Sequence, residues 1–254
     1  MNSIVAGPEV PTVMLSDVTM AERPFIWRTC MADIYAVFYP RTLHNYLENV
    51  IAPALLAIET SISDLAQSAE GWAPFALSDM EVVRCETLLA SSLAVQSLWE
   101  RQLRTYLQAC ASQLRPGDEC EQQAQHTSWQ KVENAFSELR QIPLSAFPSH
   151  PKLTELNLLG NVARHGGGAS EKALRKLRPD FWLNPQITTP MVSLDHLRDF
   201  VAAIIAFWED AETIYLESLD RKHENVVAEL ARRRAAGRWF PPVAMEGNDA
   251  GGRR

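Results

Sequence analysis

The stretch that decides the fold class is residues 78–117, SDMEVVRCETLLASSLAVQSLWERQLRTYLQACASQLRPG. Ser78 and Glu81 match the S-x-x-E capping box that marks the start of a helix. Large apolar residues then recur at the spacing of one helix face, at Leu89, Leu93, Trp99, Leu103, Leu107 and Leu114. Pro116-Gly117 stops the pattern. These signals predict one helix of about 37 residues, roughly 55 Å long at 1.5 Å per residue.

Helical patterns also surround this stretch, with Gly and Pro concentrated between them. Pro53 lies inside the first of them and is expected to kink or split it, whereas Pro40 suits its first turn. Residues 118–126 read as a polar loop, and Gly237 ends the last pattern. We expect further helices at about 40–69, 129–142, 150–165, 170–177 and 194–236.

The chain therefore belongs to the all-α class. We expect a helical bundle with two long antiparallel helices in a single domain over residues 25–240, because no segment alternates apolar and polar residues as a strand would. Residues 1–24, with three prolines, read as an extended arm, and residues 241–254 as a disordered tail. The polar second half of the last helix is expected to project or to pack on a second copy.

The charge of the chain is unevenly distributed. The net charge of −7 argues against a protein that coats nucleic acid or an anionic membrane. However, residues 1–160 hold 10 basic and 18 acidic residues, whereas 161–254 hold 14 and 13. Two stretches, 161–178 and 221–238, each carry a net +4. They are candidates for contact with an anionic partner, or else are ordinary solvated helix faces.

Composition also bears on location and cofactors. The four cysteines form no C-x-x-C pair, so we interpret them as reduced thiols that bind no metal. We expect no cofactor. The amino terminus lacks the basic start and apolar core of a signal peptide, and no run approaches 18 uncharged apolar residues. The sequence thus predicts a cytoplasmic protein with no membrane contact. The cysteines are Cys30, Cys85, Cys110 and Cys120.

The motif that bears most on function is ELNLLGNVARHGGG, residues 155–168. On a helix, Asn161 and His165 share a face and Arg164 lies beside them. His165 stands at the carboxyl end, where the helix dipole favours a cation, and the glycines leave room for a ligand. His165 as general acid or base with Arg164 as a phosphate-binding cation would suit phosphodiester chemistry. The alternative is that His followed by Gly simply ends a helix well.

The same residues carry a resemblance to a family. Asn161-x-x-Arg164-His165-Gly, followed by Ser170, Leu174 and RPDF at 178–181, resembles the N-x-x-K-H-G motif region of HEPN-like bacterial proteins. The resemblance implies an α-helical bundle that dimerises. It also implies a metal-independent ribonuclease of toxin–antitoxin or phage-defence systems, with the site in the dimer cleft.

Residue roles follow from the resemblance. His165 matches the family histidine and Asn161 its polar position, but the positions of the signature Arg are occupied by residues 158–160, LLG. Arg164 or another basic residue would have to substitute for it. The catalytic candidates are therefore His165, Arg164 and Asn161. The substrate-binding candidates are Lys172, Arg175, Lys176 and Arg178, and the supporting candidates on the facing long helix are Glu100 and Arg101.

Three functions follow as hypotheses. The first is a homodimeric HEPN-like protein that binds or cuts RNA, with an antitoxin or defence partner. The second is an inactive HEPN-like module that binds a partner protein or nucleotide, and the third is a helical scaffold. Asp195, His196 and Asp199 read as a helix-start charge cluster rather than a metal site. Residues 239–242, WFPP, read either as a docking peptide or as an apolar clip onto the bundle.

Overall fold

The computed structural model describes residues 27–125, 128–183 and 189–241, and within them the chain is helical with no strand. The predicted arm at 1–24 and the predicted tail beyond Pro241 lie outside the described residues. The α-helices are α1 Tyr35–Tyr46, α2 Ala52–Gln67, α3 Ala73–Leu114, α4 Glu119–Gln125, α5 Trp129–Arg140, α6 His150–His165, α7 Ala169–Leu177, α8 Leu194–Ser218 and α9 Glu224–Ala235. Short 3₁₀ turns are η2 Met31–Ile34, η4 Leu144–Ala146 and η5 Pro179–Phe181, and η3 Leu47–Ile51 is a π-helical turn. The all-α class is confirmed.

The first helix starts earlier than predicted. Pro40 lies inside α1 and not at its start, because buried Ala32 and Ala36 extend the packed face toward the amino terminus. Burial of that face offsets the hydrogen bond that Pro40 cannot donate. The disturbance predicted at Pro53 is present as the π turn η3 immediately before α2. A π turn spaces its hydrogen bonds more widely and so accommodates the missing proline N–H.

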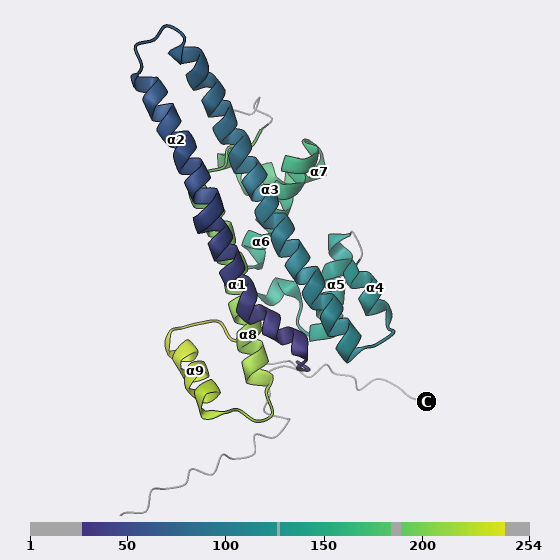
Figure 1. Cartoon of the computed structure of the whole chain (residues 1–254). Helices are drawn as coiled ribbons and strands as arrows, with labels where there is room; N and C mark the ends of the chain where they lie inside the picture. Colours follow the sequence, from purple (N-terminus) through teal and green to yellow (C-terminus); the bar gives the residue numbers. More distant parts are fainter. Residues whose placement is uncertain (1–26, 126–127, 184–188, 242–254) are drawn as a thin grey trace, which may run out of the picture.

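The longest helix is α3, with 42 residues, and it also starts earlier than predicted. The capping-box reading of Ser78 was wrong, since Ser78 lies inside α3. Pro74 fills the first turn instead, and the preceding Ala73 is buried. The helices α2 and α3, joined by residues 68–72, lie side by side and rise beyond the other helices (Figure 1). We call α2 together with the first part of α3, residues 52–88, the hairpin.

The middle of the chain follows the sequence closely. The predicted helices at 129–142, 150–165 and 170–177 are confirmed as α5, α6 and α7. The loop predicted at 118–126 was wrong, because α4 forms there. Its Cys120 and Ala124, four residues apart, are both buried, and the helix packs on α5.

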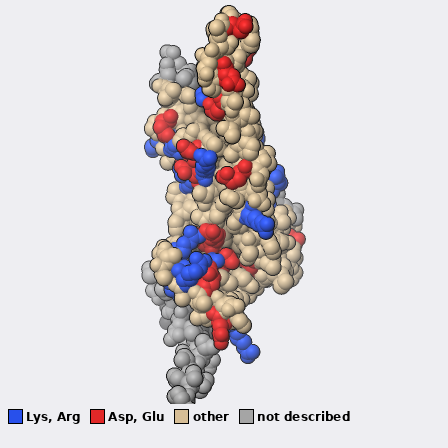
Figure 2. All heavy atoms as spheres, turned by 60° about the vertical axis from the view of Figure 1, so that its left-hand side comes forward, with Lys and Arg blue, Asp and Glu red and all other residues tan. Residues whose placement is uncertain are grey.

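The single helix predicted at 194–236 was also wrong. The chain leaves α8 at Ser218 and turns back as α9, whose first turn is capped by His223. Arg233 of α9 pairs with Glu212 of α8 at 2.6 Å, and Arg234 and Arg238 pair with other α8 carboxylates. In Figure 2, basic and acidic side chains are intermixed over this region. Four of the six basic residues of the 221–238 stretch therefore pair with the chain's own acids.

The core is aromatic and centres on α3, α5 and α8. Phe207 lies 4.8 Å from the ring of Phe147 and 6.0 Å from that of Phe136. Trp99 packs on Phe207 edge-on. Trp239 stacks on Phe147 at 5.1 Å, so residues 239–241 act as a clip onto the bundle. Most tryptophans fill the core as predicted, but Trp72 on the hairpin is exposed.

One buried carboxylate makes stability depend on pH. Asp210 of α8 is only 5% exposed, and burial raises its pKa to about 7 although Arg233 acts in the opposite direction. Between pH 4 and 7 the folded state therefore holds a proton that the unfolded state has lost, so this group lowers stability as pH rises. We expect Asp210→Asn to remove that decline and to stabilise the protein by about 1–2 kcal/mol at pH 8. Urea unfolding across this pH range measures it, with exposed Asp64→Asn as the control; equal pH slopes for the wild type and Asp210→Asn would contradict it.

Candidate functional site

The glycine turn has the backbone that its sequence indicates. The helix α6 ends at His165, and the Gly166 N–H donates to the carbonyl of Val162 at 2.8 Å. Gly166 and Gly168 have φ values of 73° and 120°, which residues with a side chain adopt at a cost. His165 is exposed and Asn161 half-buried. The turn thus presents His165 to solvent.

Arg164 is directed toward α3. Its guanidinium donates to Oε1 of Gln96 at 3.2 Å, and Gln96 in turn donates to Glu100 at 2.8 Å. Glu100 also forms an ion pair with Arg104, in which Oε1 of Glu100 lies 2.6 Å from Nη2 of Arg104. The prediction that Glu100 faces the motif agrees with this chain of bonds, whereas its neighbour Arg101 is exposed. Gln96, which lies between Arg164 and Glu100 in this chain of bonds, was not predicted. The sequence pattern that indicates it is a polar residue on an apolar helix face, four positions before Glu100.

The predicted substrate-binding residues divide into two pairs. Lys172 and Lys176, four apart on α7, are exposed. Arg175 forms a 2.6 Å ion pair with Glu171 and stacks on Trp182 at 4.3 Å. The lysines are free to meet an anion from solvent, whereas Arg175 already has internal partners.

Arg178 also has internal partners. It pairs with the buried carboxylate of Glu155, with Asp180 at 2.6 Å, and stacks on Phe181. His196, in the capping box of α8 with Ser193, lies 3.2 Å from Arg178. Burial and the Arg178 charge lower the pKa of His196. Arg178 therefore links α6 to the start of α8. These internal contacts explain the position of its side chain without a bound substrate.

Gly160 sets the approach of α6 to α3. A Cβ there would lie 2.9 Å from Cγ of Gln96, whose side chain is buried. We expect Gly160→Val to cost about 1–3 kcal/mol and to break the Gln96–Arg164 bond. Chemical denaturation measures the cost, with Gly71→Ala as the control because nothing lies within 4 Å of its Cβ. A Gly160→Val protein as stable as the Gly71→Ala control would contradict this packing.

A second feature is the surface of the hairpin. Large apolar side chains stand out from it: Leu56 is 68% exposed, Trp72 58% and Phe75 77%. Val82 and Val83 on α3 are exposed as well. Large apolar side chains exposed in this number on one part of a fold favour an interaction surface there. The sequence reasoning missed these residues because it assigned the tryptophans to the core.

The base of the hairpin contains an open apolar groove of about 400 Å³. The groove lies between α2, α3 and the start of α8, with Glu59 and Arg84 among its polar residues. Its apolar lining is Leu55, Leu56, Leu88, Met191, Val192 and Leu194. A cavity of this size accepts one or two large apolar side chains.

The chain from the start of η2 to the end of α2 is apolar as well. Helical residues Met31–Gln67 are long and apolar enough to cross a membrane, with an 18-residue window of mean hydropathy 1.2 that is 11% buried. Length and composition alone are weak evidence for a span. Because so little of this window is buried, most of its apolar surface is not covered by other parts of the chain that the structure describes.

Within the described part of the chain, no group of three or more His, Cys, Asp or Glu side chains is arranged to hold a metal ion. The candidate cluster at 195–199 has His196 engaged with Ser193 and Arg178. Comparison with protein-family models, curated proteins and solved structures returned no match.

Proposed function

We propose that the chain is a HEPN-like helical module that binds a partner protein through its hairpin. The observation that supports this is the exposure of Leu56, Trp72 and Phe75 on the hairpin, which rises beyond the rest of the fold (Figure 1). Aromatic side chains of this kind commonly supply most of the energy of a protein interface. The groove at the hairpin base would receive an anchoring side chain.

The charge of the hairpin indicates the chemistry of the partner. Residues 56–87 hold six acidic residues and one basic residue, a net −5. The tip of the molecule is accordingly tan and red in Figure 2. Such a surface repels a second copy and an anionic membrane, but attracts a basic amphipathic helix. The partner is therefore a protein segment with an apolar face flanked by Lys or Arg.

Fluorescence anisotropy with a designed helical peptide tests this proposal. The peptide has leucine at the a and d heptad positions and lysine elsewhere. We expect the wild-type chain to bind it, and Trp72→Ser or Phe75→Ser to weaken binding about 30-fold each, the effect of an interface hot spot. Leu177→Ser on α7, equally apolar and half exposed, is the matched control and should bind as the wild type does.

Two further probes separate the alternatives. The same peptide with glutamate in place of lysine should not bind, and vesicles containing phosphatidylserine should not retain the protein. Equal binding of both peptides, or retention by the vesicles that Trp72→Ser abolishes, would contradict a basic protein partner.

A second candidate function is RNA cleavage at the glycine turn. It is favoured by the exposure of His165, Lys172 and Lys176 around a turn that leaves room for a phosphate. In this role two copies form a composite HEPN-like site, His165 assists attack by the 2′-hydroxyl, and Arg164 leaves Gln96 to stabilise the phosphate charge.

An assay in EDTA tests this second role. Wild-type protein should cut mixed RNA and His165→Ala should be slower by about 10²–10⁴-fold. The protein should also be a dimer by light scattering. Equal cleavage by both proteins would remove His165 from the chemistry.

A further inference from the structure

A buried polar cluster lies where η2, α3 and α5 meet. Arg140 of α5 is fully buried and pairs with Asp33 at 2.7 Å, and Tyr106 donates its hydroxyl to the same carboxylate at 2.9 Å. The Arg140 nitrogen that pairs with Asp33, Nη2, also lies 2.7 Å from Sγ of Cys110 and 3.4 Å from Sγ of Cys30. The two sulfurs are 3.7 Å apart. One guanidinium therefore bridges a pair of thiols that are 80 residues apart in sequence.

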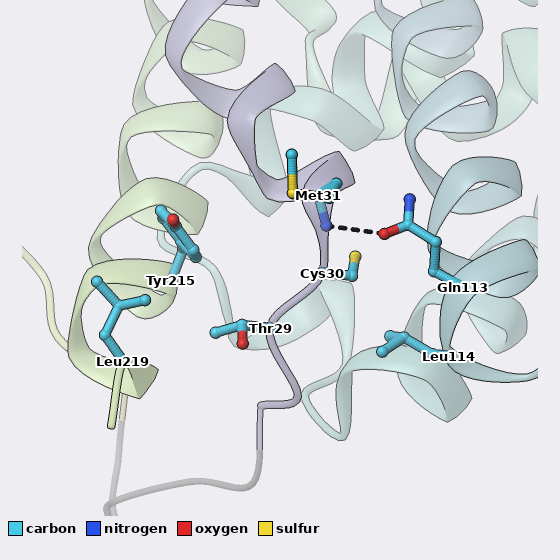
Figure 3. A pocket seen from close by; sticks show the side chains of 7 residues that line it. All are labelled: Thr29, Cys30, Met31, Gln113, Leu114, Tyr215 and Leu219. Atoms are coloured by element: carbon cyan, nitrogen blue, oxygen red, sulfur yellow. Dashed lines mark hydrogen bonds between the residues drawn. The ribbon is translucent and has the colours of Figure 1, made fainter. Parts of the chain in front are cut away.

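An open pocket of about 410 Å³ is lined by Cys30 and gives access to this member of the pair. Figure 3 shows the Cys30 side chain at the pocket, with Thr29 and Met31 on its own segment and Tyr215 of α8 opposite. Cys30 is partly exposed there, whereas Cys110 is buried behind it. A small oxidant can reach Cys30 and cannot reach Cys110.

We infer that Cys30 and Cys110 form a peroxide-reactive dithiol site, in which Cys30 is the attacking thiol and Cys110 the resolving thiol. In the first step the Cys30 thiolate forms a bond to one peroxide oxygen and the O–O bond breaks. The leaving hydroxide takes a proton from solvent, which gives a sulfenic acid and water.

In the second step the Cys110 sulfur bonds to the Cys30 sulfur and the S–O bond breaks. The Cys110 proton leaves with the hydroxide as a second water. Two thiols have then lost two electrons to one hydroperoxide. The sulfurs need to close from 3.7 Å to about 2.05 Å, the length of a disulfide bond.

The charges around the pair support these roles. The hydrogen bond from Cys110 and the positive charge of Arg140 lower the pKa of Cys30 to about 6, against burial and the charge of Asp33. Burial and the neighbouring sulfur raise the pKa of Cys110. Burial also raises the pKa of Tyr106, so the phenol stays protonated and donates to Asp33. The pair thus ionises once, at the accessible sulfur.

The test uses the whole chain treated with one equivalent of hydrogen peroxide. We expect a mass loss of two hydrogens and a Cys30–Cys110 disulfide in the peptide map. Cys110→Ser should stop at a sulfenic acid on Cys30 that dimedone traps. Cys85→Ser, a partly exposed cysteine on α3 outside the cluster, is the matched control and should form the disulfide as the wild type does.

Because a variant in the core can misfold, a second measurement uses the wild type alone. Iodoacetamide should modify Cys30 about tenfold faster than Cys85 at pH 7. As the pH is lowered, the alkylation rate of Cys30 should fall with a midpoint near pH 6, because the thiolate is then protonated. Retention of both thiols after peroxide, or equal alkylation rates at Cys30 and Cys85, would overturn the inference.

Discussion

Replacing Arg140 by methionine is expected to lower the free energy of unfolding by about 3–5 kcal/mol. Arg140 is fully buried, and its removal leaves the Asp33 carboxylate, 1% exposed, without its cation. The guanidinium also donates to the backbone carbonyl of Arg28 and stacks on Trp27 at 4.3 Å. Methionine fills much of the volume but replaces none of these bonds. Urea unfolding followed by circular dichroism measures the loss.

A matched control and a double variant separate charge from packing. Arg84→Met on the hairpin breaks solvent-exposed pairs with Glu59 and Glu81, and should cost at most about 1 kcal/mol. Adding Asp33→Asn to Arg140→Met should recover part of the loss, because the uncompensated charge is then gone. An Arg140→Met protein as stable as Arg84→Met would contradict the buried pair.

Phe207→Ala is expected to cost about 3–5 kcal/mol. Its ring touches Trp99, Phe136 and Phe147 and is fully buried, so truncation leaves a cavity where three helices meet. The same substitution at Phe75 removes an equal side chain that is 77% exposed, and should change stability by less than about 0.5 kcal/mol.

Thermal and urea unfolding of the two variants provide the comparison. Comparable losses at Phe207 and Phe75 would mean that the hairpin is packed on the fold and not free for a partner. A neutral Phe75→Ala therefore also tests the premise of the proposed function.

The sequence predicted the helices whose signals are local. The helix α6 ends just before Gly166–Gly168 and α7 begins just after it. Glycines adopt the positive φ that this turn requires, so the sequence itself marks the break. The break between α8 and α9 was not predicted, because it depends on pairs such as Arg233–Glu212 that form only after the chain has turned back. The capping-box pattern at Ser78 misled because Pro74, four residues earlier, starts the same helix.

The candidate site was predicted less well. The prediction placed His165 and Glu100 near the motif. His165 is exposed at the end of α6, and Glu100 is linked to Arg164 through Gln96. Arg178 was assigned to a substrate, but its carboxylate partner Glu155 lies 23 residues away and pairing across that separation has no local signal. The Cys30–Cys110 pair was missed for the same reason.

The proposed role of the hairpin is tested most directly by hydrogen exchange of the full chain with and without the leucine–lysine peptide. Protection is expected on residues 52–88, which cover α2 and the first part of α3, with the glycine turn and α9 unchanged. Protection at α9 or at residues 161–178, with the hairpin unchanged, would contradict it.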